Sequence, residues 1–328
     1  MRWLTQICEY YPLAKLSQLT PSDVTQFLEQ YRHDEGYVSS SSTANDIPLP
    51  ILPAQKGTMT LVGSGPGHPD LLTQAALRAI NTADLVLADK LVPAEILALI
   101  PRRTEVYIAR KFPGNAERAQ QELQSKGLAA LHQGKRVIRL KQGDPYIFGR
   151  GGEEFLFFRQ HGYQVSVVPG LTSAMTATAL AGITATHRGV ADQVVICTGT
   201  GRKGALPTPP EYVKSRTAVF LMALHRIEDL VTSLVGAGWP ENISCAVVER
   251  ASCRDQRVIR TRLKDVARAI ESEGSRPPGL LIVGWACDVL NTNVADNEWV
   301  VDEGLHGDFW SSFQGAGIAE KDGKNGDL

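Results

Sequence analysis

The chain has 328 residues, of which 43% are hydrophobic and 21% charged, and its 34 Lys and Arg against 35 Asp and Glu give a net charge of -1. At about 150 residues per domain this length indicates two domains, and the ordinary composition excludes a disordered chain, a collagen-like fibre and a coiled-coil rod. The near-neutral charge argues against a nucleic-acid binder that works through a global basic field, so a polyanionic partner would have to meet a local cluster of cations.

The first 33 residues carry a helical pattern, and a linker over residues 34–56 follows them. Leu16 and Leu19 have helical spacing, and Ser22-Asp23 is a candidate cap for a second helix. The linker alternates proline with aliphatic residues over 47–53, which favours an extended conformation. Because residues 1–33 are too few to bury a core alone, we expect either a docking helix pair or the remnant of a larger upstream domain.

Residues 57–200 alternate apolar, β-rich runs with helical stretches. The predicted strands cover residues 59–62, 85–88, 105–109, 137–140, 165–168 and 194–197, and the predicted helices cover 71–82, 94–99, 116–132, 153–160 and 173–181. Such alternation is typical of parallel strands joined by crossover helices. We therefore expect an N-terminal α/β lobe over residues 57–200.

A second α/β lobe is expected over residues 201–290, after a Gly- and Pro-rich loop from Gly199 to Pro210 that has the composition of an interdomain connection. Strands are predicted at residues 218–222, 244–248, 257–261 and 280–283, and helices at 227–237 and 263–271. The strands at 244–248 and 257–261 have the spacing of a hairpin, which predicts a mixed sheet. Residues 291–328 turn polar and glycine-rich, and we expect this tail to fray.

The cysteines indicate the redox state of the compartment, and the uncharged stretches can be checked for a membrane span. The chain has five cysteines, too few and too scattered for a disulfide framework, and no Cys or His cluster has zinc spacing. We expect a reducing compartment, the cytoplasm, and no metal. The N-terminus lacks the apolar core of a signal peptide, and the uncharged stretch from Gly162 to Thr186 contains Pro169 and glycines, which favours a strand, turn and helix over a membrane span.

A glycine-rich loop, Gly63-Ser-Gly65-Pro-Gly67, lies between the first predicted strand and the first helix of this region. Glycines there let the backbone approach a ligand closely, and a helix N-terminus favours anionic or polar groups. The loop matches only the first two glycines of the dinucleotide fingerprint, and Pro66 lacks an N–H that a pyrophosphate would use. A tight turn without a ligand is the alternative interpretation.

Two more such loops follow later strands. The run Arg139-Leu-Lys-Gln-Gly-Asp-Pro-Tyr-Ile-Phe-Gly-Arg-Gly-Gly-Glu-Glu154 puts Asp144 at a strand's carboxyl end, where it could accept hydrogen bonds from ribose hydroxyls or an amine. Pro169-Gly-Leu-Thr-Ser173 puts two hydroxyls at a helix start, where capping is their default explanation. Together the three loops predict one crevice.

Five segments of the chain resemble those of a known family. Its segments Gly63-Ser-Gly-Pro-Gly67, Ala88-Asp-Lys-Leu-Val92, the run from Arg139 to Glu154, Val168-Pro-Gly-Leu-Thr-Ser-Ala174 and Ile183-Thr-Ala-Thr-His-Arg-Gly189 are similar, in order and approximate spacing, to those of uroporphyrinogen-III C-methyltransferases. The resemblance extends from Thr58 to Trp285. The run from Gly-Asp-Pro to Gly-Gly-Glu-Glu and the Thr-His-Arg sequence are its most specific parts.

The resemblance implies a tetrapyrrole methylase fold, with two α/β domains and S-adenosylmethionine in the cleft between them. Carried over position by position, the cofactor-binding residues would be Pro66, Gln142, Gly143, Asp144, Ile147, Thr172, Ser173, Met222 and Ala251. Asp89 matches the family's proposed proton acceptor and Lys111 its proposed donor, although the adjacent Arg110 could fill the donor role.

The chain departs from the family pattern at two places. Gln142 stands where the family usually has the first glycine of Gly-Gly-Asp-Pro, and Ala88-Asp-Lys-Leu-Val92 stands where it has Tyr-Asp-Arg-Leu-Val. The first change would be harmless if position 142 contributed only its backbone. The second change replaces the residues on either side of Asp89, so the contacts that the family makes with substrate there do not carry over directly.

The chemistry of the reaction is compatible with these residues. Methyl transfer from a sulfonium to carbon is an in-line displacement that requires alignment, and one carboxylate base, Asp89, is a sensible minimum for removing the proton afterwards. Without the resemblance, Asp89 could equally end a strand and face solvent. Uroporphyrinogen is a polycarboxylate, so cations must converge on it, and the candidates are Arg110, Arg150, His187 and Arg188. Each of them taken singly could also be a solvated surface charge.

We therefore predict an S-adenosylmethionine-dependent enzyme that methylates uroporphyrinogen III at ring carbons 2 and 7, giving precorrin-2 for sirohaem. The resemblance suggests a homodimer that binds neither nucleic acid nor membrane. Residues 1–10 resemble the stretch that links a dehydrogenase domain to the methyltransferase in fungal fusion proteins. Since the nucleotide-binding half is absent from this sequence, we expect no dehydrogenase or ferrochelatase activity from it.

Other interpretations stay open at this point. Within the same fold, a cobalamin-route precorrin methyltransferase, diphthine synthase and a ribosomal RNA methyltransferase are rivals, and the neutral charge disfavours the last. An NAD-dependent oxidoreductase would need an acidic residue about 20 positions after the glycine loop, near Asp84 or Asp89. A non-catalytic binding module is the third class.

Overall fold

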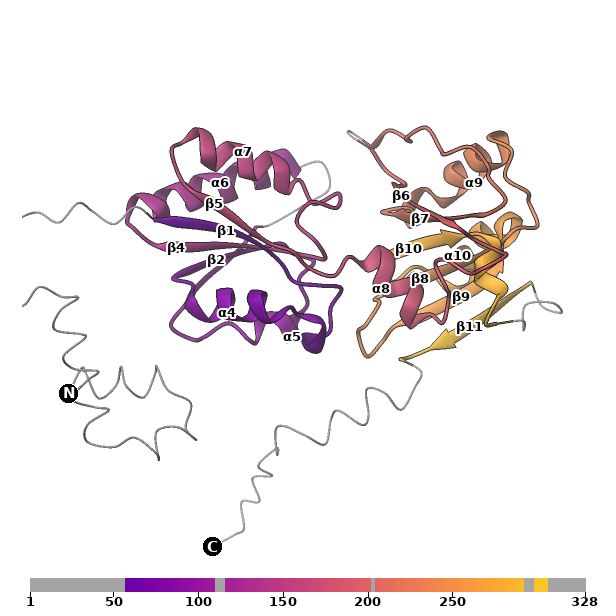
Figure 1. Ribbon diagram of the computed structural model, residues 1–328, viewed down its shortest axis with the longest axis horizontal. Coiled ribbons are helices and arrows are strands. Elements are labelled where there is room, and N and C mark those ends of the chain that lie inside the picture. Colours follow the sequence, from indigo (N-terminus) through magenta and orange to yellow (C-terminus); the bar gives the residue numbers. More distant parts are fainter. Residues whose placement is uncertain (1–56, 110–115, 202–203, 292–297, 306–328) are drawn as a thin grey trace, which may run out of the picture. The chain divides into compact units, whose positions relative to one another are not determined.

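The computed structural model describes residues 57–109, 116–201, 204–291 and 298–305 (Figure 1). The predictions for the segment 1–33, the linker 34–56, Arg110, Lys111 and the end of the tail lie outside these ranges. Within them, the chain forms two sheets, each covered by helices. None of the described helices is long and apolar enough to cross a membrane.

The first sheet is wholly parallel, with strand order β3-β2-β4-β1-β5. Its strands are β1 (Thr58–Gly63), β2 (Leu85–Ala88), β3 (Glu105–Ile108), β4 (Arg136–Lys141) and β5 (Val165–Val168). The connecting helices are α4 (Gln74–Thr82), α5 (Ala94–Leu97), α6 (Ala116–His132) and α7 (Gly151–Gln160), with a short 3-10 helix at Pro69–Leu71. The apolar runs read from the sequence therefore form the expected parallel α/β lobe.

Helices cover both faces of this sheet, which explains why its central strands are buried on both sides and, apart from the charged residues of β4, are largely apolar. On one face, Leu61 and Leu87 pack with Leu123 of α6 and Phe158 of α7. On the other face, Val62 and Val86 pack with residues of α4 and α5, among them Ile80 and Ile96. The two helix pairs lie on opposite sides of the strands in Figure 1.

The second sheet is mixed, with strand order β11-β9-β8-β10-β7-β6. Its strands are β6 (Gln193–Thr198), β7 (Arg216–Leu221), β8 (Ser244–Glu249), β9 (Arg257–Arg262), β10 (Gly279–Val283) and β11 (Trp299–Glu303). Only β6 and β7 pair in parallel, and the expected hairpin of β8 with β9 is confirmed. The helices are α8 (Ser173–Leu180), α9 (Ile227–Gly236) and α10 (Val266–Glu273), with 3-10 helices at Leu224–Arg226, Leu263–Asp265 and Trp285–Asp288.

The division between the two lobes lies earlier than the sequence predicts. The helix α8 packs against the second sheet, where Ala174 and Ala177 contact the cluster that contains Val219 and Ala246. β6 pairs with β7 of the same sheet, so the lobe boundary expected at residue 200 is wrong and follows β5 instead. Strand and helix alternate across this boundary without a break, so periodicity alone cannot tell which sheet a strand joins.

Two further expectations are corrected. The loop from Gly199 to Pro210 connects β6 to β7 within one sheet, so it is not an interdomain connection. The tail expected to fray contributes β11, which pairs antiparallel with β9 from Trp299 to Glu303. A five-residue strand that ends in two consecutive acidic residues is too weak a pattern to recognise without the edge strand with which it pairs.

Three glycines bring three loops into backbone contact at the carboxyl edge of the first sheet. β4, β1 and β5 are neighbours, so the loops that follow them start side by side. Gly65 and Gly143 exchange backbone hydrogen bonds of 3.2 and 2.9 Å. A Cβ at Gly63 would lie 2.6 Å from the Gly143 carbonyl oxygen, and a Cβ at Gly170 would lie 2.2 Å from it. Side chains are therefore excluded where the three loops cross.

We predict that Gly170→Ala destabilises the protein by about 1–3 kcal/mol, because the added methyl group overlaps backbone that cannot move aside without breaking the crossing. The matched control is Gly152→Ala in α7, where a Cβ meets nothing within 4 Å. Its free energy of unfolding should be unchanged or higher by up to about 1 kcal/mol, since alanine favours helix. Urea unfolding measures both, and equal stabilities of the two variants would contradict the prediction.

Candidate functional site

A cavity of about 600 Å³ lies against the loops at the carboxyl edge of the first sheet and against the second sheet. All nine residues predicted to bind the cofactor line it: Pro66, Gln142, Gly143, Asp144, Ile147, Thr172, Ser173, Met222 and Ala251. They come from segments far apart in sequence. The single crevice predicted from the three loops is therefore present.

Gln142 uses its side chain as well as its backbone. Its Nε2 donates a 2.7 Å hydrogen bond to the carbonyl oxygen of Pro66, which ties the end of β4 to the glycine loop after β1. Its Oε1 is buried and has no hydrogen-bond partner among the described residues. Because a buried polar atom without a partner is costly, this acceptor favours a donor group on a ligand. The replacement of the family's glycine thus adds a contact that a glycine could not make.

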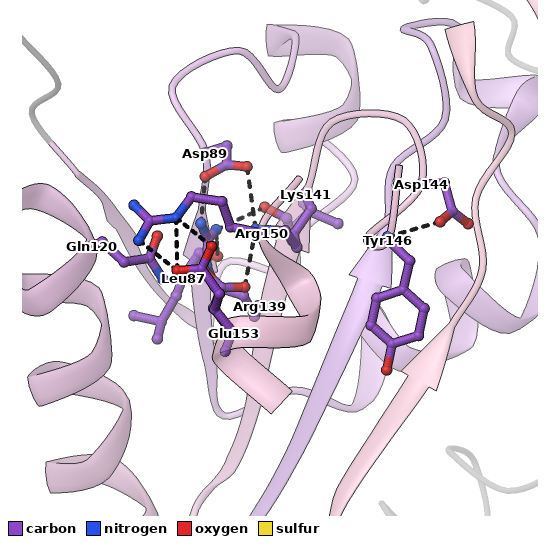
Figure 2. Close-up of polar contacts among 11 residues, drawn as sticks. Leu87, Asp89, Gln120, Arg139, Lys141, Asp144, Tyr146, Arg150 and Glu153 are labelled. Atoms are coloured by element: carbon purple, nitrogen blue, oxygen red, sulfur yellow. Dashed lines mark hydrogen bonds and ion pairs between the residues drawn. The ribbon is translucent and has the colours of Figure 1, made fainter. Parts of the chain in front are cut away.

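Asp144 is first an organiser of the loops. Its Oδ1 accepts a 2.8 Å hydrogen bond from the backbone N–H of Tyr146, and its Oδ2 accepts one of 3.1 Å from the N–H of Gly170 (Figure 2 draws the first). The second bond holds the loop after β5 against the loop after β4. A carboxylate offers about four lone-pair sites, so Asp144 can still accept from a ligand.

The hydroxyl of Thr172 caps α8. It accepts a 3.3 Å hydrogen bond from the N–H of Ala174, as the capping interpretation expects. Ser173, the first residue of the helix, also lines the cavity. The N-terminus of α8 therefore faces the same space as the glycine loops.

Met222 follows β7 with a left-handed backbone, φ 54°, which is uncommon for a residue with a side chain. Two residues that the sequence analysis did not single out surround it. The hydroxyl of Thr200 donates a 2.9 Å hydrogen bond to the carbonyl oxygen of Met222 and lies 3.0 Å from Nε2 of His225. Since that hydroxyl has given its proton to Met222, Nε2 of His225 is the donor in the second bond. All three line the cavity.

Asp89 follows β2 and lies above a buried cluster of charges on β4 (Figure 2). Its Oδ1 pairs with Nη2 of Arg139, and its Oδ2 lies 3.8 Å from Nζ of Lys141. The Asp89 side chain is 13% exposed, whereas Arg139 and Lys141 are 2% and 1% exposed. Of these three groups, the carboxylate is therefore the one most open to the cavity.

Glu154 of α7 supplies the second negative charge. Its Oε1 accepts from Nε of Arg139 at 2.9 Å and from Nε2 of Gln120 at 2.7 Å, and its Oε2 lies 3.0 Å from Nζ of Lys141. Arg139 also donates to the carbonyl oxygens of Leu87 and Leu140, at 3.1 and 3.2 Å. Two cations and two carboxylates thus balance one another, as largely buried charges require.

The burial of this cluster acts differently on its two cations. Burial opposes the charge of Arg139, but Asp89 and Glu154 outweigh it, so the pKa of this guanidinium is raised. Burial and the neighbouring Arg139 charge lower the pKa of Lys141, and the two carboxylates offset this only in part. Lys141 therefore holds its proton less firmly than an exposed lysine does.

Arg150 lines the cavity and begins α7 with a left-handed backbone, φ 59°. Its guanidinium pairs with Glu153 at 2.7 Å and with Glu117 of α6 at 3.3 Å. Both of these carboxylates are exposed, so the pairs are exchangeable with solvent ions. Arg150 can therefore meet an anionic group in the cavity if these contacts are exchanged.

The other predicted cations are placed elsewhere. His187 and Arg188 line a separate depression with Asp192 and Ser215, and neither lines the cavity beside Asp89. The expectation that they converge with Arg150 is therefore wrong, because the turn around Gly189 carries them to the start of the second sheet. Arg110 and Lys111 lie outside the described residues. Within the described ranges, no group of three His, Cys, Asp or Glu residues is arranged to hold a metal.

Arg139, Lys141 and Glu154 lie in the glycine-rich run from Arg139 to Glu154, and the sequence alone assigned them no role. A signal was present in the pattern. Alternate residues of a strand face the same side, so two cations at positions 139 and 141 of an otherwise apolar strand share one face. Buried cations on the same face require carboxylates opposite them, and the sequence cannot say which carboxylates these are.

Comparisons with known proteins agree with this geometry. The family model for tetrapyrrole (corrin/porphyrin) methylases matches residues 58–267. A uroporphyrinogen-III C-methyltransferase of Saccharomyces cerevisiae is 52% identical over 93% of this chain and 55% of its own length, and a probable one of Schizosaccharomyces pombe is 48% identical over 88% and 62%. This chain thus spans about three-fifths of those relatives.

Among solved structures, the uroporphyrin-III C-methyl transferase of Thermus thermophilus complexed with S-adenyl homocysteine is 36% identical. It superposes with a TM-score of 0.62 over 71% of this chain and 94% of its own. The expected fold class is confirmed by the two sheets and by these matches. The chain belongs to the tetrapyrrole (corrin/porphyrin) methylase family.

Proposed function

We propose that this chain transfers methyl groups from S-adenosylmethionine to ring carbons 2 and 7 of uroporphyrinogen III, giving precorrin-2 for sirohaem. The observation that carries the proposal is that the nine candidate cofactor residues line one cavity together with Asp89. The names and identities of the relatives support the same substrate and reaction. No observed feature favours a nicotinamide cofactor or a non-catalytic module over this assignment.

The cavity residues fit the proposed cofactor. The volume of about 600 Å³ lies within the usual range for small-molecule sites. The unpartnered Oε1 of Gln142 offers an acceptor for an amine or hydroxyl, and Gly143 lets the backbone of its loop approach a ligand without a side chain. Gln142, Gly143, Asp144, Thr172 and Met222 would hold S-adenosylmethionine, which supplies an electrophilic methyl group when bound.

Asp89 is the proposed base that removes a proton from the macrocycle after methylation, because the methylated ring carbon itself already carries a side chain and has no proton to lose. Its carboxylate lies at the cavity wall, where it pairs with Arg139. Leu91 and Phe148 line the same cavity, so a bound substrate would cover the carboxylate and strengthen its interaction with a proton on the substrate. Lys111 remains the proposed proton donor, with Arg110 as the alternative.

Arg150 is proposed to receive a substrate carboxylate at the cavity. Since the whole chain carries a net charge of -1, recognition of a polycarboxylate depends on local cations. Among the predicted cations that fall in the described ranges, Arg150 lines the cavity, while Arg188 lines another depression. Bidentate pairing of a guanidinium with a carboxylate gives both affinity and orientation.

A homodimer and a cytoplasmic location complete the proposal. Several large apolar side chains near the cavity are exposed, among them Leu91, Tyr146, Leu171 and Met175, and an apolar surface of this kind favours a protein partner. Sedimentation equilibrium should give twice the chain mass.

Cysteines at positions 197, 245, 253 and 287 are free, which suits a reducing compartment.

The first test is calorimetry with S-adenosylhomocysteine, followed by an assay for a methylated chromophore formed from uroporphyrinogen III. We expect one site per chain and methyl transfer to carbon. Asp89→Asn should bind S-adenosylhomocysteine as the parent protein does and lose about 10²–10⁴-fold in turnover, because a general base contributes that much. A parent protein that binds no S-adenosylhomocysteine would overturn the proposed function.

A second test separates the two arginines. Arg150→Ala should raise KM for uroporphyrinogen III by about tenfold or more, because a charge-assisted contact in the cavity is lost, while the affinity for S-adenosylhomocysteine stays unchanged. Arg188→Ala removes the same charge from the other depression and should leave KM within about twofold of the parent value. The reverse order of effects would place the substrate elsewhere.

A further inference from the structure

Glu154 is a buried carboxylate that the proposed reaction does not use directly. It lies in the first turn of α7 and is 1% exposed. It does not line the cavity, so it cannot touch a bound substrate. A buried carboxylate is costly to keep unless cations and hydrogen-bond donors surround it. The contacts that stabilise this buried charge therefore indicate the role of Glu154.

The contacts of Glu154 fix two cations at once. Its Oε1 accepts from Nε of Arg139 and from the amide of Gln120, and its Oε2 lies 3.0 Å from Nζ of Lys141. With Nε bound to Glu154 and Nη1 bound to backbone carbonyls, the planar guanidinium of Arg139 has one orientation. That orientation directs Nη2 to Asp89 (Figure 2).

We propose that Glu154 is a positioning residue that holds Arg139 and Lys141 so that the Asp89 carboxylate meets the substrate in one orientation and with a tuned basicity. The inference rests on the proposed function, in which Asp89 is the base. Glu154 acts through the two cations and makes no contact with the reacting atoms.

The charge balance explains the tuning. Arg139 and Lys141 of β4 face both carboxylates, and the uncharged amide of Gln120 on α6 faces Glu154. With Glu154 ionised, each cation is shared between two anions. Without that charge, both cations would act on Asp89 alone, which favours its charged form and makes it a weaker base.

The central experiment is the variant Glu154→Gln. It keeps the shape of the side chain and the oxygen that accepts from Gln120, but it removes the negative charge at position 154. We expect turnover to fall by about tenfold, less than for Asp89→Asn, and the acid limb of the pH profile of kcat to move about one pH unit lower. The affinity for S-adenosylhomocysteine should not change. Glu154→Asp retains the charge and should return the acid limb toward its parent position.

The matched control is Asp84→Asn. Asp84 also pairs with an arginine of β4, Arg136, at 3.1 Å, but at the opposite end of β2 and near solvent. Its removal should leave both turnover and the pH profile unchanged. If Glu154→Gln leaves the acid limb in place, as Asp84→Asn does, the positioning role is wrong.

A stability measurement tests the same coupling without catalysis. An Asp89 carboxylate paired with cations stabilises the folded state at neutral pH, and this contribution is lost as the pH falls. We compare the unfolding free energies of the parent and Asp89→Asn against pH, with and without Glu154→Gln. The contribution of Asp89 should persist to lower pH in the Glu154→Gln background, and an unchanged dependence would overturn the inference.

These results separate failure of the inference from failure of the proposed function. A parent protein without methyl transfer would overturn the function, while the stability comparison would still test the coupling of Glu154 to Asp89. If Glu154→Gln does not fold, the double variant with Lys141→Met removes one charge of each sign. It should fold and be more stable than Glu154→Gln, because no buried cation is left without a partner. If the double variant also fails to fold, the proposed balance between Glu154 and the two buried cations is wrong.

Discussion

The backbone crossing of Gly63, Gly143 and Gly170 is the constraint on which the site depends. It brings the ends of β1, β4 and β5 so close that a Cβ at Gly170 would lie 2.2 Å from a carbonyl oxygen. The loops after these strands therefore start from one point and diverge around the cavity. Asp144 and Gln142 then tie the three loops together by hydrogen bonds, so contacts within the chain hold the cavity wall in place.

Next to this backbone crossing lies a cluster of opposite character, made of buried charges. Arg139 and Lys141 lie on β4, the strand that leads into the Gly143 crossing. The same strand therefore contributes both the backbone at the crossing and the buried cations beside the cavity. The cluster is balanced, and of its members that line the cavity, Asp89 is the most exposed. Rigid backbone and fixed charges together give the kind of preorganised site that a transfer reaction between two bound molecules requires.

Most of the first sheet was predictable from the sequence, because its strands are short apolar runs bounded by polar or glycine-rich loops. Leu85–Ala88, Val165–Val168 and Ala116–His132 have the predicted bounds. The candidate cofactor residues were named from motif resemblance and each lines the cavity, while their role in binding stays a prediction. The failures occur where the answer depends on long-range pairing: β6 joining β7, the late strand β11, and the position of His187 and Arg188.

The sequence by itself determined the local elements, the glycine loops and the family resemblance, because periodicity, turn chemistry and motif spacing are all short-range properties. Only the tertiary structure decided which sheet received α8 and β6, since burial depends on partners that lie elsewhere in the chain. It also decided that Glu154 and Asp89, 65 positions apart in the sequence, share the same two cations. A buried charge needs a counter-charge in space, and no pattern along one chain specifies where that counter-charge lies.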